Sequence, residues 1–146
     1  MSEGSSLVSD VARLQAIMHR GVPLAAAWGI ELLEAQDGTA CLRLPANPVL
    51  LRPGNTVSGP ALMGLADVAI WAALLSTTRG QDNSVTSSMN VNFLSPAGPG
   101  PLIAQARIVK AGKRMIYGEI HIFAEGSDRP AVHVTTHWVV IGPARG

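Results

Sequence analysis

The sequence predicts an α+β domain in which an antiparallel sheet packs around one long buried helix. Three observations lead to this class: an apolar segment of helical length at residues 58–75, two short strand-like segments before it, and four long ones after it. Strands joined by short turns pair antiparallel, because parallel neighbours require a long crossover connection. Strands and a helix that do not alternate regularly along the chain are typical of the α+β class.

The composition bounds the size and the association of this domain. The 146 residues are enough for one domain with a sizeable core and too few for two. Hydrophobic residues make up 47% of the chain and charged residues only 14%, a low charge fraction for a small monomer. We therefore expect the chain to hide part of its surface against a copy of itself. The net charge of +1 predicts no general binding of nucleic acid or anionic membrane.

The sequence also indicates a compartment. Cys41 is the one cysteine, which excludes an internal disulfide and fits reducing surroundings. The first residues lack the basic start and apolar core of a secretory signal. The longest apolar stretch, residues 60–75, is too short to span a bilayer and carries Asp67 near its centre. We expect a cytoplasmic protein.

The chain is expected to begin with a helix. Residues 5–19 place apolar side chains near one helical face, and the Gly and Pro at residues 21–23 interrupt the pattern. We assign residues 1–22 to an N-terminal helix with its tail, and residues 23–146 to a single domain.

Two short strands are expected next. Residues 28–33 and 39–44 have strand-like composition, and the turn signal at residues 36–38 separates them. A segment with Pro and Gly, residues 45–54, then leads to the central helix.

The central helix carries its own start and stop signals. Ser58 is predicted to cap its N-terminus, and Pro60 sits just inside it, where the missing N–H costs little. The helix should end near Ser76, before Gly80. Small residues recur along it and keep it thin, so that a sheet can approach closely: Ala61, Gly64, Ala66, Ala69, Ala72 and Ala73.

The second half of the chain is expected to be almost entirely strand. In residues 85–94 a simple alternation puts Val85, Met89 and Phe93 on one face and Thr86 on the other. Three more strands are predicted after it, joined by turns at residues 111–113 and 126–128: residues 101–109, 115–123 and 131–141.

Asp67 is the most informative residue of the sequence. It is the only charged residue between Arg52 and Arg79, and it lies inside the apolar helix. Burying a carboxylate costs several kcal/mol or raises its pKa, unless it is paired or hydrogen-bonded. Such carboxylates are candidates for functional sites. The alternative is a structural carboxylate with backbone or hydroxyl partners at a subunit interface.

Two segments carry a family resemblance: residues 57–67, VSGPALMGLAD, and residues 85–96, VTSSMNVNFLSP. They resemble the hotdog-fold acyl-CoA thioesterases of the phenylacetate-pathway (PaaI-like) type. Those proteins carry a His-Gly-Gly segment, an acid nine residues after the His, and a strand of the form V-T-x-x-x-N-I-x-F-L-x-P. The resemblance covers residues 25–141. It implies a five- or six-stranded antiparallel sheet around one long helix, two subunits paired edge to edge, and a thioester bound between them.

The resemblance also implies roles for single residues. Gly59 matches the family's oxyanion glycine, whose N–H binds the thioester carbonyl at the helix start. Ala61 is the next available N–H, because Pro60 has none. Asp67 matches the acid that acts as base or nucleophile. Thr86 matches a small hydroxyl residue that orients the water or the carboxylate.

The spacing of two of these residues predicts an assembly. Gly59 and Asp67 are eight residues apart, so they lie about 12 Å apart along a helix axis. One thioester carbon cannot touch both. We therefore expect a homodimer with two composite sites, each using Gly59 of one subunit and Asp67 of the other, and a homotetramer if two dimers pack together.

The chain departs from the family pattern at two positions. Ser58 stands where the family usually has His, so the polar contact with the thioester is lost or is made by the Ser58 hydroxyl. Arg52 stands where many members have an Asn that holds the water, and it could be a surface charge, a dimer contact or a phosphate ligand. Asn55 is the nearby amide that could replace that Asn. Trp71, one helical turn beyond Asp67, is expected in the core or interface, or along the acyl pocket.

A basic turn is the candidate contact for the coenzyme A phosphates. Lys110, Lys113 and Arg114 cluster there, as in relatives, although solvated surface charges are the simpler interpretation. Simple structural interpretations also exist for two other candidates: Gly59 as a close-packing residue and Thr86 as an ordinary strand residue.

No metal and no cofactor are expected. His133 and His137 are four residues apart on a predicted strand, about 13 Å, which is too far to share one ion. Cys41 lies in a predicted strand and is expected to be a small buried side chain.

The expected function is hydrolysis of a small or medium acyl-CoA, aliphatic or aryl-acetyl, to the carboxylic acid and CoA. The first alternative is a non-catalytic acyl-CoA-binding hotdog protein. A hydratase or dehydratase ranks lowest, because no histidine lies near Asp67 in the sequence.

Overall fold

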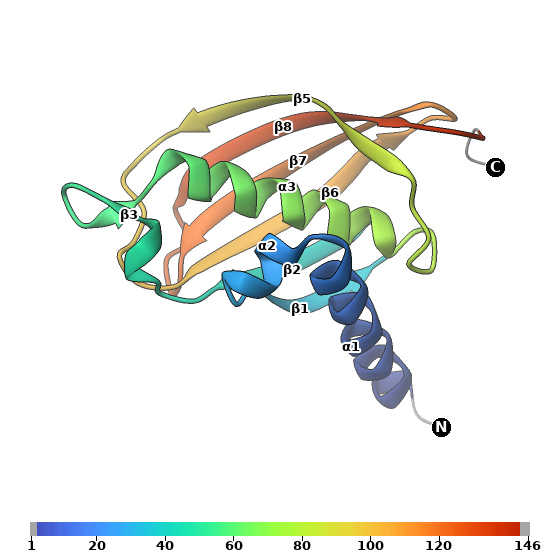
Figure 1. Cartoon of the computed structure of the whole chain (residues 1–146), viewed down its shortest axis with the longest axis horizontal. Coiled ribbons are helices and arrows are strands. Elements are labelled where there is room, and N and C mark those ends of the chain that lie inside the picture. Colours follow the sequence, from blue (N-terminus) through green and yellow to red (C-terminus); the bar gives the residue numbers. More distant parts are fainter. Residues whose placement is uncertain (1–2, 144–146) are drawn as a thin grey trace.

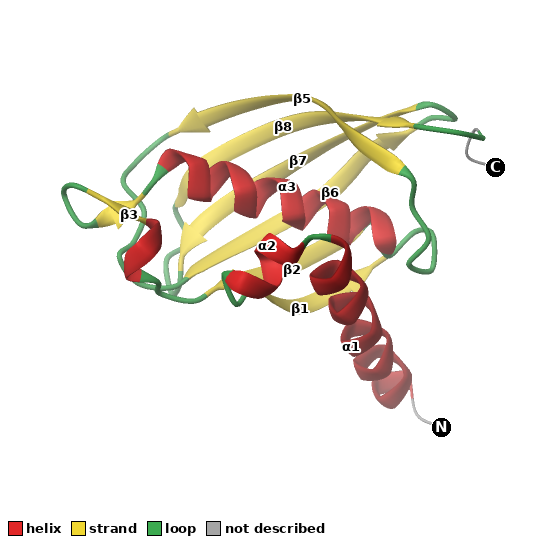
Figure 2. Ribbon diagram, viewed as in Figure 1, coloured by secondary structure: helices red, strands yellow, loops and turns green. Residues whose placement is uncertain are grey.

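One long helix lies against the face of an antiparallel sheet (Figure 1, Figure 2). The computed structural model describes residues 3–143, with side chains from residue 10 onward. In that range the strands form a six-stranded sheet of order β1-β2-β6-β7-β8-β5 and a small sheet of β3 and β4. The elements are α1 (Glu3–Gly21), α2 (Pro23–Ala27), β1 (Glu31–Gln36), β2 (Thr39–Leu44), η1 (Pro48–Leu50), β3 (Leu51–Arg52), β4 (Thr56–Val57), α3 (Gly59–Leu75), β5 (Ser84–Phe93), β6 (Leu102–Ala111), β7 (Met115–Ala124) and β8 (Pro130–Val140). The predicted α+β class is confirmed.

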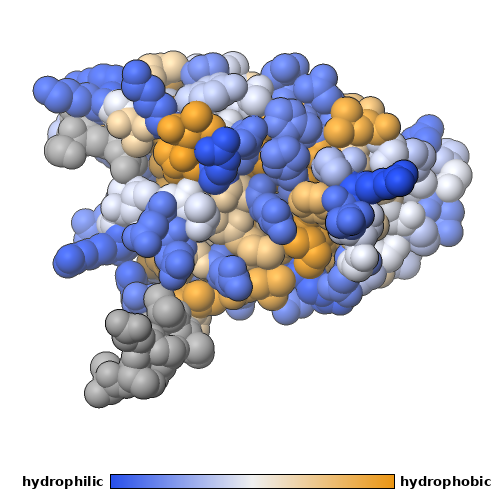
Figure 3. Space-filling view, turned by 180° about the vertical axis from the view of Figure 1, so that it is seen from behind, coloured by the Kyte–Doolittle hydropathy of each residue, from blue (hydrophilic) through white to orange (hydrophobic). Residues whose placement is uncertain are grey.

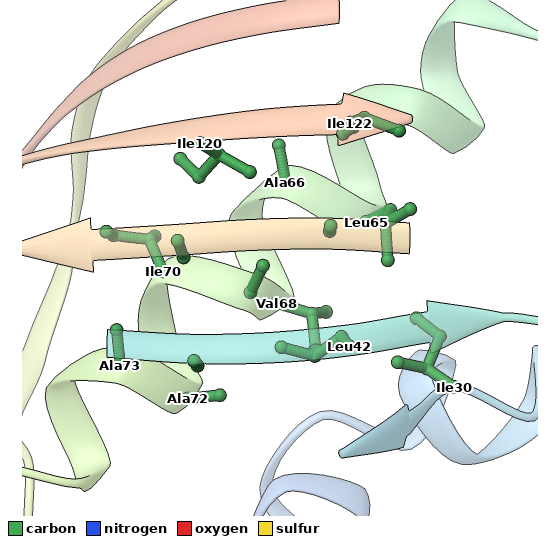
Figure 4. Packing of buried hydrophobic residues seen from close by; sticks show 14 of the residues in the cluster. Ile30, Leu42, Leu65, Ala66, Val68, Ile70, Ala72, Ala73, Ile120 and Ile122 are labelled. Atoms are coloured by element: carbon green, nitrogen blue, oxygen red, sulfur yellow. The ribbon is translucent and has the colours of Figure 1, made fainter. Parts of the chain in front are cut away.

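The central helix α3 forms the middle of the hydrophobic core. Its start and end agree with the prediction, and the Ser58 Oγ accepts a hydrogen bond from the Ala61 N–H at 3.4 Å. Figure 4 shows side chains of α3 packed beside Leu42 of β2 and Ile120 and Ile122 of β7. Because apolar residues occur on all its sides, α3 is stable only in such an interior position.

Two glycines allow α3 to lie close to its neighbours. A methyl group at Gly64 would come within 2.8 Å of the Trp28 ring, so α3 approaches the segment after α2 at this residue. A methyl group at Gly118 of β7 would overlap Ile70 of α3. The small residues of α3 and Gly118 of the sheet therefore both allow the helix and the sheet to lie close together.

The structure differs from the prediction around the short elements. Pro23 starts the short helix α2 rather than only ending α1, because proline suits the first turn of a helix. The first strand begins at Glu31, three residues late, because Gly29 has a φ of 69° and forms a turn. The segment of residues 45–54 contains η1 and half of the β3–β4 hairpin, which the sequence pattern did not reveal.

The two edges of the large sheet differ. Helix α1 covers the β1 edge: Gln15 Oε1 accepts a hydrogen bond from the Leu32 N–H at 2.8 Å, and His19 Nε2 lies 2.7 Å from the Ile30 carbonyl oxygen. The β5 edge has no covering element in the described chain, and most of its side chains are exposed. An open edge of this length is a template for pairing with another strand.

A bulge changes the alternation of β5. Its pairing with β8 shifts register between Thr86 and Ser88, so Ser87 is an extra residue. As a result Thr86 and Phe93 both face α3, although they are seven residues apart. The predicted placement of these two residues on opposite faces is wrong for this reason.

The other face of the sheet is turned away from α3. On β7 and β8, buried residues alternate with more exposed ones, which lie on this outer face. The view from behind in Figure 3 shows many hydrophilic residues with apolar patches between them. Within residues 3–143, no helix is both long enough and apolar enough to cross a membrane.

Candidate active site

Asp67 lies at the middle of α3, beside the first residues of β5. The Thr86 Oγ1 donates a hydrogen bond of 2.6 Å to the Asp67 Oδ1. Burial raises the pKa of Asp67 above its ordinary value, and the Thr86 hydrogen bond opposes that rise. No cation is paired with this carboxylate among the described residues, so burial decides the direction of the shift. A proton-accepting role fits a carboxylate in these surroundings.

A hollow of about 380 Å³ opens beside this carboxylate, and we call it the Asp67 hollow. Its walls come from the end of α1, the middle of α3, the residues at and just before the start of β5, and the end of β8: Gly21, Val22, Asp67, Val68, Trp71, Asp82, Ser84, Val85, Thr86 and Trp138. The Trp71 ring lies against Gly21, where a side chain would collide with it. The hollow therefore presents an aromatic and aliphatic wall next to two carboxylates. One is Asp67, and the other is Asp82, which accepts hydrogen bonds from the Ser84 N–H and hydroxyl.

Trp138 is a residue of this hollow that the sequence did not single out. It pairs with Thr86 across β5 and β8 and is only 6% exposed. Its Nε1–H is buried and has no acceptor among residues 3–143. The alternation of β8 puts Trp138 on the inner face with Val134 and Val140. That pattern could have placed the ring near the helix, but only the bulge in β5 puts it beside Thr86.

A second hollow, of about 420 Å³, lies at the N-terminal end of α3, and we call it the Gly59 hollow. Its walls come from the β3–β4 hairpin, the helix start and the end of β5: Arg52, Thr56, Val57, Gly59, Leu62, Phe93, Leu94, Ser95, Pro96 and Ala97. Phe93 lies next to Gly59, at ordinary contact distance from where a methyl group would stand.

The helix start leaves one N–H free. Ala61 donates to the Ser58 hydroxyl, and Leu62 donates to the Ser58 carbonyl at 3.0 Å. Pro60 has no N–H. The Gly59 N–H has no acceptor within the described chain, so it is the one N–H of this first turn that is available to a ligand. An anionic or polarised oxygen is the ligand that such a group favours.

The two hollows lie at opposite ends of β5. Ser84, Val85 and Thr86 from its start line the Asp67 hollow, whereas Phe93 from its end lines the Gly59 hollow. No residue lines both of them. One chain therefore keeps its free N–H and its carboxylate apart, as their spacing along the helix predicts.

The other predicted site residues are divided between these regions. Arg52 lines the Gly59 hollow and Trp71 the Asp67 hollow, but Asn55 lines neither. Asn55 is exposed at the hairpin turn, with a φ of 61°, and its N–H donates to the Arg52 carbonyl at 3.2 Å. Ser58 serves as the helix cap, and Ala61 is buried with its N–H already used.

The basic turn stands apart from both hollows. Lys110 lies near the end of β6, and Lys113 and Arg114 lie in the turn before β7. All three are exposed, and Arg114 Nη1 donates to the Gly142 carbonyl. β8 separates β7 from β5 in the sheet, so this turn is two strand spacings, about 10 Å, from the start of β5. The turn is close enough for the far end of an extended ligand and too distant for its reacting group.

One group of potential metal ligands occurs in the described chain, on the outer face of the sheet. It consists of Glu119, His121 and His133. His137, which the sequence suggested as the partner of His133, instead contacts Tyr117 and Ser88.

Comparison with known proteins identifies the family. Residues 54–131, more than half of the chain, match the thioesterase superfamily, and the chain belongs to it. A candidate esterase of Saccharolobus solfataricus is 30% identical over 112 residues, which are 77% of this chain and 73% of the relative. A candidate esterase of Thermoplasma acidophilum is 30% identical over 90 residues, covering 62% of this chain and 67% of the relative.

Solved structures confirm the hotdog fold. The PaaI protein of the Escherichia coli phenylacetic acid degradation operon superposes with a TM-score of 0.81 at 23% identity, covering 94% of this chain and 98% of that one. A candidate thioesterase from Silicibacter sp. TM1040 superposes with a TM-score of 0.78 at 28% identity, covering 88% and 90%. The chain is a hydrolase of the thioesterase superfamily, as its sequence predicts.

Proposed function

We propose that this protein hydrolyses a small or medium acyl-CoA thioester to the carboxylic acid and CoA, at sites formed between two subunits. The observation that carries the proposal is the position of two complementary groups. A free N–H at Gly59 and a partly buried carboxylate at Asp67 occupy separate hollows at the two ends of β5, the edge strand of the sheet.

The edge strand β5 suits a two-fold interface. Its ten residues include no charge and no proline, and Val85 and Phe93 are 47% and 55% exposed. Natural sheets protect solvent-exposed edges with charge, proline or a covering element. The absence of charge and proline from β5 favours a paired edge, which gives a continuous sheet across two subunits.

Such pairing would complete the site. In a two-fold antiparallel pair, the start of β5 in one subunit lies opposite the end of β5 in the other. The Asp67 hollow of one subunit then meets the Gly59 hollow of its partner. The dimer has two equivalent sites, and each contains the free N–H of Gly59 and the carboxylate of Asp67.

The chemistry follows from these two groups. The thioester carbonyl oxygen accepts a hydrogen bond from the Gly59 N–H, which stabilises the oxyanion as it forms. Asp67 takes a proton from a water molecule while the water oxygen bonds to the carbonyl carbon. The tetrahedral intermediate then breaks its C–S bond, and the CoA sulfur leaves and takes up the proton. Thr86 holds Oδ1 of Asp67 and leaves Oδ2 for the water.

The residues that line the two hollows indicate which part of the substrate each hollow would bind. The Asp67 hollow, with Val68, Trp71 and Trp138, offers an apolar surface to the acyl group. The exposed side chain of Arg52 in the Gly59 hollow offers a cation to the CoA portion. The exposed side chains of Lys110, Lys113 and Arg114 offer cations to its phosphates at the far end of the ligand.

Thiol release from a series of acyl-CoAs tests this function. Acetyl-, butyryl-, octanoyl-, palmitoyl- and phenylacetyl-CoA are compared with the wild-type protein and with Asp67→Asn. We expect turnover with the short or medium substrates in the wild type and its loss in the variant. Saturable binding of the same thioesters without thiol release would instead identify an acyl-CoA-binding protein.

A further inference from the structure

Three side chains with metal-binding groups meet on the outer face of the sheet, away from α3. His121 of β7 pairs directly with His133 of β8, and Glu119 precedes His121 by two residues on the same face. Their neighbours in sequence, such as Ile120 and Ile122, are buried on the inner face. The alternation of the strands therefore brings two imidazoles and one carboxylate together without any turn or loop.

The distances in this group suit one ion. The imidazole rings of His121 and His133 have centroids 4.6 Å apart, and the His133 Nε2 lies 3.0 Å from the Glu119 Oε2. The three potential ligand atoms all lie within 4.8 Å of one another. A Zn²⁺ ion with bonds of about 2.0–2.2 Å spaces its ligand atoms about 3–3.6 Å apart. Small rotations of the side chains are enough to reach that spacing.

Arg107 orients the carboxylate of Glu119. Its guanidinium holds the Glu119 Oε1, with the Nε at 2.8 Å and the Nη2 at 2.6 Å, and leaves the Oε2 toward His133. The carboxylate is therefore oriented by Arg107, as expected of a metal ligand supported by a neighbouring residue.

The ligand types and the residues around this group favour some divalent ions over others. Cys41 lies in the same row across the sheet, because it pairs with Gln105, which pairs with His121. Two strand spacings, about 10 Å, keep this thiol out of the coordination shell. A hollow of about 450 Å³ that includes Cys41, Gln105, Glu119 and His121 adjoins the group and leaves room for water ligands. Two imidazoles, one carboxylate and water suit Zn²⁺, Co²⁺ or Ni²⁺ rather than Mg²⁺ or Ca²⁺.

We propose that Glu119, His121 and His133 form a binding site for a divalent transition-metal ion such as Zn²⁺ on the outer face of the sheet. This site is separate from the Asp67 hollow, which lies on the inner face. The sequence argument against a metal compared two histidines of one strand. The cross-strand pairing joins His133 to a histidine of the neighbouring strand instead.

Metal titration of the untagged full-length protein tests the proposal. After removal of bound ions with a chelator, Co²⁺ is added and its visible absorption is recorded, and Zn²⁺ binding is measured by calorimetry. We expect one ion per chain and a Co²⁺ spectrum that shows nitrogen ligands. His121→Ala and His133→Ala should each weaken binding by at least about tenfold, because each removes a direct ligand.

The control is His137→Ala, which removes an outer-face histidine of the same strand that is not in the group. It should bind the ions as the wild type does. Zn²⁺ should also raise the Tm of the wild type and of His137→Ala but not of Glu119→Gln, a variant of nearly the same shape. An absence of saturable binding, or equal binding by the wild type and the His121→Ala His133→Ala double variant, would overturn the proposal. Neither outcome depends on thioester hydrolysis.

Discussion

At the scale of single residues, Asp67 determines the pH dependence of the proposed reaction. Its burial raises its pKa, so the reactive carboxylate is lost at a higher pH than for an exposed aspartate. We expect kcat/KM to fall on the acidic side through this raised pKa. Asp67→Asn should lower kcat by about 10²–10⁴-fold, the usual contribution of a general base. A pH–rate profile of both proteins checks this, and a variant with most of its activity would remove Asp67 from the mechanism.

Asp67 also affects stability. The ionised carboxylate that the reaction needs lowers the stability of the fold. Because the folded-state pKa is above the unfolded-state pKa, the folded protein binds the proton more tightly. The free energy of unfolding therefore decreases as the pH rises from the unfolded-state pKa through the folded-state pKa. Asp67→Asn removes the free-energy cost of burying an ionised carboxylate, so the variant should be more stable than the wild type at neutral pH. Thermal unfolding of both proteins at acidic and neutral pH measures the difference, and equal differences at the two pH values would contradict it.

Thr86 affects the pKa of the Asp67 carboxylate. Its hydroxyl donates to the ionised form of Asp67 and lowers the pKa against the effect of burial. Thr86→Val keeps the shape and removes the donor, so we expect the acidic limb of kcat/KM to move to higher pH. Thr86→Ser keeps a hydroxyl and is the matched control. An unmoved limb in Thr86→Val would show that the hydroxyl has no influence on the titrating group.

Two substitutions at Gly59 separate the role of its N–H as oxyanion donor from the role of its small size in packing. Gly59→Pro deletes the free N–H at a position that suits proline, whereas Gly59→Ala keeps it and adds a methyl at ordinary distance from Phe93. We expect kcat to fall about 10²–10³-fold in the proline variant, the effect of losing one oxyanion donor. The alanine variant should keep most of its kcat. Equal losses in both variants would indicate a packing role for Gly59.

The sequence predicted part of this site for physical reasons. An isolated carboxylate in an apolar helix and a serine before a proline are visible in the sequence, so Asp67 and the helix start were predictable. The contribution of Trp138 was not, because it depends on a bulge in β5 that shifts the register by one residue. The Glu119, His121 and His133 group was missed because strand pairing, and not sequence spacing, brings its members together.

At the scale of elements, the contact between α3 and β7 depends on one glycine. A methyl at Gly118 overlaps the end of the Ile70 side chain, which is fully buried. We expect Gly118→Ala to lower the free energy of unfolding by about 1–3 kcal/mol, the usual cost of overpacking. Ile70→Val removes the overlapping carbon, so the double variant should lose less than the sum of the two single losses. Chemical denaturation of the four proteins measures the coupling, and simple additivity would contradict this packing.

The elements also show which sequence signals were reliable. The α3 bounds and the four later strands followed from capping residues, glycine turns and long apolar patterns. The short elements α2, η1 and the β3–β4 hairpin did not, since two to five residues carry little periodicity. The first strand was misplaced because Trp28, an apolar residue of strand-like type, belongs to the turn that follows α2.

At the scale of the whole molecule, the proposed dimer joins each hollow of one chain to the other hollow of its partner. The helix length between Gly59 and Asp67 separates the donor from the carboxylate, and the uncharged edge strand β5 offers a surface for a second copy. The low charge fraction of the chain agrees with such an assembly. The interface would therefore be part of the catalytic site and not only a source of stability.

The composite site is the central claim, and mixed dimers test it most directly. Gly59→Pro and Asp67→Asn subunits, each expected to have little activity alone, are co-expressed with different affinity tags, and thiol release is measured on the purified mixed dimer. A composite site predicts about half of the wild-type activity, because one of the two sites combines the intact Gly59 of one subunit with the intact Asp67 of the other. No activity in a folded mixed dimer would contradict the claim, since it would place both residues in the same subunit's site.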